Sequence, residues 1–168
     1  MKKIYSIIIL AMILLSSCSY KFIPLRGTYP KSSIVIDKSF NDVWNNVIDF
    51  VSENGYSFTY LDKENGLIVF KSSLIYSFTF EDNDGKPINP DAYFVLPIFT
   101  SEQGYDKRVI SSINIICNWN IRVRALNDKT KVSINFYDSD ITYLKTSYPN
   151  IRFASTGKFE KEAFEKIK

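Results

Sequence analysis

The chain contains no histidine, and this absence removes the side chain that most often serves as a general base or a metal ligand. Only two cysteines are present, Cys18 and Cys117. Excess charge is scarce as well: 21 basic residues stand against 18 acidic ones, and two of the basic residues, Lys2 and Lys3, precede an apolar leader. Strong binding of nucleic acid needs clustered positive charge. The composition therefore disfavours histidine-dependent catalysis and nucleic-acid partners.

The length and the apolar content are those of one folded domain. The chain has 168 residues, of which 45% are hydrophobic and 15% aromatic. A chain of this size is enough for one domain and hardly for two, and its hydrophobic content supports a packed core.

A short apolar segment near the N-terminus predicts an export signal. The run IYSIIILAMILL extends from Ile4 to Leu15. A membrane-spanning helix needs roughly 20 apolar residues, so this run is too short to cross a bilayer. Its length, its basic flank and the small residues Ser16 and Ser17 that follow fit the apolar region of a secretory signal.

The residues Leu15, Ser16, Ser17 and Cys18 closely resemble the bacterial lipobox, which consists of an aliphatic residue, two small residues and an obligatory cysteine. The resemblance implies that Cys18 is modified with diacylglyceryl, that cleavage falls between Ser17 and Cys18, and that the new amine is acylated. Residues 1–17 would then be a lipoprotein signal peptide. The alternative is an ordinary signal peptide, or a short membrane anchor, with an incidental cysteine.

Acylation of Cys18 would fix the mature chain to a lipid bilayer. Each buried methylene contributes about 0.8 kcal/mol and one chain binds only marginally, so two or three chains make release negligible. In envelopes with two membranes, an Asp after the cysteine often signals retention in the inner membrane. Ser19 therefore favours the outer membrane, facing the periplasm. Lipidation would also leave Cys117 without an intramolecular partner.

Residues 18–31 contain two prolines and a glycine, and they are interpreted as a lipidated tether. Fourteen extended residues reach roughly 45–50 Å, which would lift the domain clear of the headgroups. The alternative is that the apolar residues of this stretch lie on the membrane or on the domain; these are Tyr20, Phe22 and Ile23. Residues 32–168 are expected to form a single envelope domain.

The segment SFNDVWNNVIDFVSENG predicts a helix. Ser39 can cap its N-terminus, Asp42 favours the first turn through the helix dipole, and Gly55 suits a left-handed stop. Apolar residues recur at helical spacing and form one stripe: Phe40, Val43, Trp44, Val47, Ile48 and Val51.

Alternating patterns predict strands on both sides of this helix. Ser32–Asp37 is a short β-rich run, Tyr56–Lys71 is expected to be a hairpin that turns at Asn65-Gly66, and Tyr76–Asp82 is a further strand. Residues 113–125 alternate between an apolar and a mostly polar face, and a partner strand follows the turn NDKT.

The remaining segments complete the expected order. Lys86–Lys107 is a proline-rich connection in which AYFVLPIF is at best an edge strand, because Pro97 cannot donate to a ladder. A closing helix is expected to start at Ser155 or Thr156. The predicted class is α+β, an antiparallel sheet with helices packed on one face, in the order β-α-β-β-(β)-β-β-α.

The segment SFNDVWNNVIDFVSENGYSFTYLDKENGLIVF resembles a motif of bacterial envelope lipoproteins. It is similar to the repeated domains of the C-subunit lipoprotein of the outer-membrane β-barrel assembly machine, and to related single-domain lipoproteins. The match covers about a fifth of the chain and consists mainly of packing and turn residues, so it implies a fold and no activity. The residues that carry it are Phe40, Val43, Trp44, Gly55, Tyr56, Asp62, Gly66, Leu67 and Ile68.

Two sets of residues are candidates for an interaction site. The first is the apolar cluster of the connection, because contiguous exposed apolar surface marks binding sites; packing over the sheet is the alternative. It comprises Tyr93, Phe94, Leu96, Ile98 and Phe99. The second is Arg122 and Arg124 on the polar strand face, which could meet an anionic headgroup or a protein, or simply face water.

Other suggestive residues have a structural interpretation. Trp44 lies on the apolar helix stripe and is expected in the core, and Cys117 is expected to be a buried thiol because no histidine could activate it. EDNDG (Glu81–Gly85) lacks the spacing of a calcium loop and is expected to be an acidic turn.

The leading functional hypothesis is a noncatalytic, membrane-anchored envelope lipoprotein that acts through protein contacts, with no cofactor, no metal and no catalytic residues. The alternative is a carrier of a small apolar ligand, with a helix gripping a curved sheet around a cavity between the Phe40–Val51 helix and the strands. An enzyme ranks last.

Overall fold

The computed structural model describes residues 21–29, 32–75, 77–100, 113–143, 146–149 and 152–168. Mostly antiparallel sheets and two helices form the regular structure of these residues, which confirms the α+β class. In chain order the elements are β1 (Lys21–Ile23), β2 (Ser33–Ile36), α2 (Phe40–Glu53), β3 (Phe58–Asp62), β4 (Leu67–Ile75), β5 (Phe78–Phe80), β6 (Phe94–Leu96), β7 (Ile98–Thr100), β8 (Ile113–Leu126), β9 (Lys129–Tyr143), β10 (Thr146–Pro149), β11 (Ala154–Ser155) and α3 (Lys158–Ile167).

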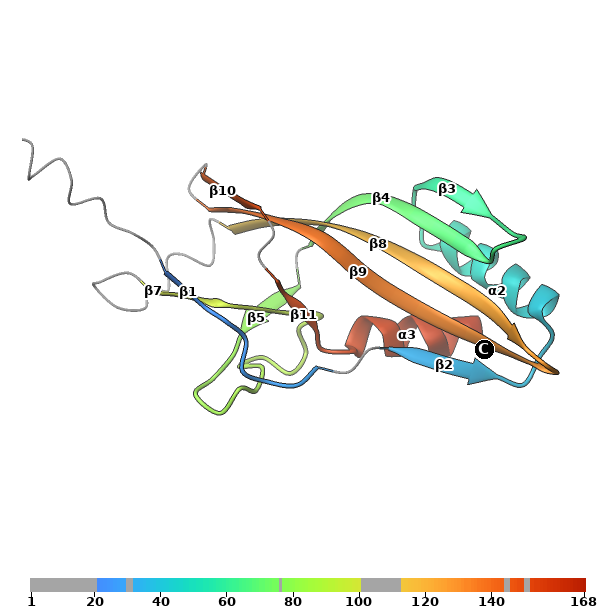
Figure 1. Cartoon of the computed structure of the whole chain (residues 1–168), viewed down its shortest axis with the longest axis horizontal. Helices are drawn as coiled ribbons and strands as arrows, with labels where there is room; N and C mark the ends of the chain where they lie inside the picture. Colours follow the sequence, from blue (N-terminus) through green and yellow to red (C-terminus); the bar gives the residue numbers. More distant parts are fainter. Residues whose placement is uncertain (1–20, 30–31, 76, 101–112, 144–145, 150–151) are drawn as a thin grey trace, which may run out of the picture.

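The main sheet has six strands and is built around the long β8–β9 hairpin, which runs along the long axis of the molecule (Figure 1). Its order is β10-β9-β8-β4-β3, and β2 also pairs with β9, near the β8–β9 turn. Every pair in this sheet is antiparallel. The predicted hairpin at Asn65-Gly66 is present as β3 and β4, and the alternation predicted for residues 113–125 is present in β8.

Helix α2 forms where the capping and the apolar stripe predict it. The Ser39 hydroxyl accepts a hydrogen bond from the backbone N–H of Asp42, at 3.3 Å, which satisfies a donor that the helix leaves free. Gly55 follows the last turn with a φ of +66°, as the left-handed stop requires. The helix buries five side chains, which are Val43, Trp44, Val47, Phe50 and Val51.

Helix α3 begins later than predicted, at Lys158. Ser155 lies in β11, and Gly157 has a φ of +86°, which no helical residue adopts. The Ser155 hydroxyl accepts from the N–H of Gly157, and Thr156 Oγ1 accepts from that of Lys158, so both residues serve the helix start from outside it.

One face of the main sheet, the inner face, packs against both helices. Its residues from β4, β8 and β9 form one cluster with buried residues of α2 and α3. The Phe70 and Trp119 rings stack with centroids 3.7 Å apart, and Tyr56 meets Trp119 edge-on at 5.1 Å. Aromatic pairs add about 0.5–1.5 kcal/mol each beyond their burial. Side chains therefore fill the space between α2 and the strands.

The connection after β5 packs on the same inner face, farther along β8. Strands β5, β6 and β11 form a small separate sheet in which β6 is the middle strand and runs parallel to β5. Pro97 lies between β6 and β7 and is outside both ladders. The expectation of at most an edge strand was therefore wrong for Phe94–Leu96. Strands β1, β7 and β11, and the separate pairing of β10, are additions to the predicted order.

Candidate interaction surface

The opposite face of the main sheet, the outer face, carries no helix among the described residues, since both helices pack against the inner face. It consists of the side chains that alternate with the buried ones along β8 and β9, together with residues of β2, β3 and β4. Its members are Ser33, Val35, Tyr60, Asp62, Leu67, Val69, Ile116, Asn118, Asn120, Arg122, Arg124, Leu126, Lys129, Lys131, Ser133, Asn135 and Tyr137.

The register brings the cations of this face together. Arg124 on β8 is the direct partner of Lys131 on β9, and Arg122 stands two residues from Arg124 on the same face. Like charges directly opposite in an antiparallel pair destabilise it. Within the described chain, neither Arg122 nor Arg124 makes a hydrogen bond or an ion pair, and both are exposed. The prediction that both arginines project from the polar face is confirmed.

Exposed apolar side chains lie on the same face as these cations. Val35, the partner of Lys131, is 55% exposed, Tyr60 on the edge strand β3 is 52% exposed, and Ile116 is 42% exposed. The described part of the connection, including β6, lies on the inner face and leaves Ile116 uncovered. The outer face thus combines arginines that make no ion pair with any described residue with scattered apolar contact area.

The apolar cluster of the connection is placed differently. Phe94 and Leu96 are buried among Ile115, Cys117 and Ile141, so their use as an exposed docking patch is corrected by the structure. They are buried because β6 is the middle strand of the β5–β6–β11 sheet and packs against the main sheet. Tyr93 is half-buried against α3, where its hydroxyl donates to Glu162 at 2.7 Å. The side chains of Ile98 and Phe99 lie outside the described part of the structure.

The remaining suggestive residues take structural positions. Trp44 is 4% exposed in the core, as expected. Burial raises the pKa of the Cys117 thiol to about 12, so the thiolate needed for nucleophilic chemistry is scarce at neutral pH. No group of three or more metal-ligating side chains gathers within the described residues.

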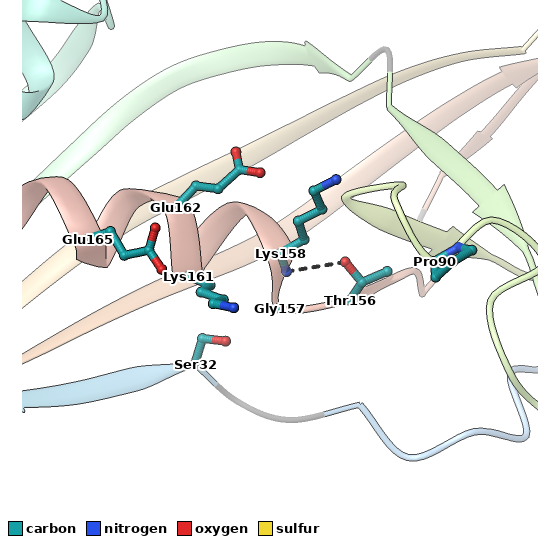
Figure 2. A pocket seen from close by; sticks show the side chains of 8 residues that line it. All are labelled: Ser32, Pro90, Thr156, Gly157, Lys158, Lys161, Glu162 and Glu165. Atoms are coloured by element: carbon teal, nitrogen blue, oxygen red, sulfur yellow. Dashed lines mark hydrogen bonds between the residues drawn. The ribbon is translucent and has the colours of Figure 1, made fainter.

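A hollow of about 640 Å³ opens at the surface beside the start of α3 (Figure 2). Its lining residues are mostly polar or charged, although their carbon atoms supply about half of the lining surface, and two of the charged groups have partners: Lys158 pairs with Asp91 at 2.8 Å, and Glu162 accepts from Tyr93. The lining residues are Ser32, Pro90, Thr156, Gly157, Lys158, Lys161, Glu162 and Glu165. The carrier hypothesis requires an apolar cavity between α2 and the strands; this hollow lies elsewhere, beside α3, and the described side chains between α2 and the strands are buried against one another.

Sequence reasoning missed one polar site, at Glu81 in the expected acidic turn. Glu81 is only 4% exposed, and its carboxylate accepts from the backbone N–H groups of Arg26 and Gly27 and from the Tyr29 hydroxyl, each at 2.8 Å. We call this arrangement the Glu81 clasp. No local signal in EDNDG indicates it, because its partners lie more than 50 residues away.

The clasp shifts the titration of both ionisable partners. Burial alone would raise the pKa of Glu81, but the donors from Arg26, Gly27 and Tyr29 lower it below its usual 4.5. The stabilising contribution of Glu81 is therefore present above pH 4.5 and is lost as the pH falls through the lower folded-state value. Burial and the neighbouring carboxylate raise the pKa of Tyr29, so its hydroxyl remains a donor at neutral pH.

Ser17 and Cys18 lie outside the described residues, so the lipidation and cleavage site stays a prediction. Within the described chain, no helix combines the length and hydrophobicity needed to cross a membrane. Comparison with known proteins finds no family model that matches the chain and no curated protein of similar sequence. The resemblance to envelope lipoproteins therefore also stays a prediction.

Proposed function

We propose that the protein is a noncatalytic, lipid-anchored envelope lipoprotein that acts by binding another protein through the outer face of its main sheet. The observation that carries the binding role is the contrast between a filled inner face and an outer face with unpaired Arg122 and Arg124. The noncatalytic assignment is supported by the lack of histidine and by the protonated, buried Cys117 thiol.

The anchor rests on the lipobox-like residues Leu15 to Cys18. Two or three acyl chains on Cys18 would hold the protein on a membrane without a spanning helix. In a cell with two membranes, Ser19 favours the periplasmic side of the outer membrane. The fold expected from the resemblance, a helix and a hairpin of the assembly-machine type, is compatible with α2, β3 and β4.

The partner that fits the outer face is a protein surface rich in Asp and Glu. Arg122, Arg124 and Lys131 repel one another across the β8–β9 ladder, and acidic groups from a partner would relieve that repulsion. The exposed Tyr60 and Val35 would supply apolar contact next to the charges.

Mass spectrometry of the mature N-terminus tests the anchor. We expect the chain to start at an acylated Cys18, and we expect Cys18→Ser to move the protein from the membrane fraction to the soluble fraction. A free thiol at position 18 in cells would overturn the proposal.

Site-specific photo-crosslinking tests the binding role. A photoreactive residue at the exposed outer-face position Asn135 should trap one protein in intact cells, whereas the same residue at the exposed α2 position Asn45 should not. The double variant Arg122→Glu, Arg124→Glu should lower that crosslink at least about tenfold, because interface charge reversal costs on the order of 1.4 kcal/mol or more.

A matched control makes the same change in charge elsewhere on the molecule. Lys63→Glu, Lys161→Glu alters two exposed lysines that lie off the outer face, and it should leave the crosslink intact. Equal crosslinking from both photoreactive positions, or an unchanged crosslink in the double arginine variant, would contradict the proposed binding face.

A further inference from the structure

The N-terminal arm, residues 21–29, is attached to the domain although its composition predicted a tether. Its first strand, β1, pairs antiparallel with β7, with Phe22 opposite Phe99. Immediately after it, the Glu81 clasp binds the arm at Arg26, Gly27 and Tyr29. Two separate contacts, a strand ladder and a buried carboxylate, therefore hold this arm.

The clasp is strong for its size because its acceptor is ionised. Hydrogen bonds to charged groups are stronger than those between neutral groups, and an unpaired buried carboxylate would carry a large desolvation cost. The buried Glu81 carboxylate thus receives its hydrogen bonds from the arm. Release of the arm would leave Glu81 without all three of these partners.

Close backbone contact reinforces the clasp. A Cβ placed on Gly27 would lie 2.2 Å from the carbonyl oxygen of Gly85, so only glycine allows this approach. Tyr29 also donates to the Gly85 carbonyl at 3.3 Å. The arm therefore contacts the Asp82–Lys86 turn through both its backbone and a side chain.

The position of the arm limits how far the domain can stand from its anchor. Only Ser19 and Tyr20 lie between Cys18 and Lys21, and the three residue steps from Cys18 to Lys21 span about 10 Å at most when extended. Strands β1 and β7 lie at one end of the long axis, and the β8–β9 turn lies at the opposite end (Figure 1). Strand β8 alone, at 14 residues, spans roughly 45 Å along that axis.

We infer that the end of the domain that carries β1 and β7 faces the bilayer, and that the Glu81 clasp, in place of a free tether, holds the domain in this orientation. The inference rests on the proposed lipid anchor at Cys18. The β8–β9 turn then points away from the membrane. The strands of the main sheet run parallel to the membrane normal, so the outer face is not covered by the bilayer and a partner can reach it.

Energy transfer to acceptor-labelled headgroups tests the orientation in the acylated protein, reconstituted in vesicles of neutral phospholipid. A donor dye is attached to a single cysteine that replaces either Asn83, in the turn that contacts the arm, or Asp128, in the β8–β9 turn. Both residues are exposed. Cys117 is buried and protonated and should not react with the dye. We expect strong transfer from position 83 and several-fold weaker transfer from position 128.

Gly27→Ala should open the clasp from the arm side, and Glu81→Gln should weaken it from the domain side. In both variants the transfer from positions 83 and 128 should become more similar, because only the three-residue ladder between β1 and β7 then holds the arm and the domain can tilt. Matched controls are Thr28→Ala, an exposed neighbour in the arm, and Asp84→Asn, which removes a charge from the same turn without touching the arm. Both controls should behave like the parent protein.

Hydrogen exchange of the Arg26 and Gly27 amides separates this inference from the anchor. In a Cys18→Ser chain without lipid, these amides should be protected, and Gly27→Ala should lower the protection at least about tenfold. Unprotected amides, or equal transfer from positions 83 and 128 in the parent, would overturn the clasp. A protected arm in a protein that cells do not acylate would overturn only the anchor.

Discussion

The two faces of the main sheet differ completely in chemistry, although alternate residues of the same strands build them. On β8, Trp119 and Ile121 point to the inner face and are nearly inaccessible, while the interleaved Arg122 and Arg124 point to the outer face and are exposed. The inner face has rings in contact and two helices over it; the outer face has two arginines that bond to no residue in the described part of the chain. Stability is therefore expected to reside in one face and recognition in the other.

Substitution of neighbouring residues on β8 should show the largest difference between the faces. Trp119→Ala removes a ring that contacts Phe70, Tyr56 and Phe136, and large-to-small changes of this kind cost about 3–5 kcal/mol. Asn120→Ala, one residue further on the outer face, should change stability by about 0.5 kcal/mol or less. Urea unfolding of both variants measures the difference, and similar losses would refute the assignment of the two faces.

Thiol reactivity should separate the faces almost as strongly. With a pKa of about 12 in place of the ordinary 9.0, the Cys117 thiolate at pH 8 is about a thousandfold scarcer than that of a free thiol. Asn135→Cys places a thiol on the exposed outer face of β9 as the comparison. In a chain with Cys18 replaced by serine, a chromogenic disulfide should label position 135 at once and Cys117 only on unfolding. Rapid native labelling of Cys117 would contradict its burial.

A smaller effect is expected at Glu160, an ionisable side chain of α3 that is only 2% exposed. Burial raises its pKa above the usual 4.5, although the Ser155 hydroxyl donates to it at 2.6 Å. The folded state then binds the proton more tightly than the unfolded state. The stability of the fold therefore falls as the pH rises from 4.5 through the higher folded-state pKa of Glu160. Glu160→Gln should raise the free energy of unfolding by about 1 kcal/mol at pH 7 and leave it unchanged below pH 4. A constant gain across pH, in urea titrations, would exclude this cause.

The smallest predicted effect is on the outer face itself. Arg124→Glu turns the repulsive pair with Lys131 into an attractive one, and opposite charges across a ladder contribute about 0.2–1 kcal/mol. Arg122→Glu, whose direct partner is Ser133, should change stability less. The gain from Arg124→Glu should disappear in high salt. A loss of stability would instead indicate that Arg124 has a packing role.

The sequence predicts the features that depend on local pattern. Ser39, Asp42 and Gly55 define α2, Asn65-Gly66 defines the β3–β4 turn, and the alternation in β8 separates the two faces. The same alternation places Arg122 and Arg124 on the outer face. Each of these signals acts within a few residues of where it is read.

Features made by distant partners could not be predicted in this way. Phe94 and Leu96 are buried because β5 and β11 pair with β6, and a run of apolar residues alone does not reveal whether it will be covered. Glu81 resembles any acidic turn residue until the arm is placed beside it. The predicted start of α3 is too early because Ser155 and Thr156 are both good capping residues. The left-handed backbone of Gly157, which delays the helix to Lys158, cannot be predicted from the sequence.

The order of the residues along the chain determines when the Glu81 clasp can form. Glu81 follows Arg26 by 55 residues, and β7 comes later still. On the proposed export route, residues 21–29 would therefore cross the membrane before the residues that hold them, and Cys18 would meet the modifying and cleaving enzymes before the arm is bound. Binding of the arm would then be a late step of maturation, which follows the proposed lipidation.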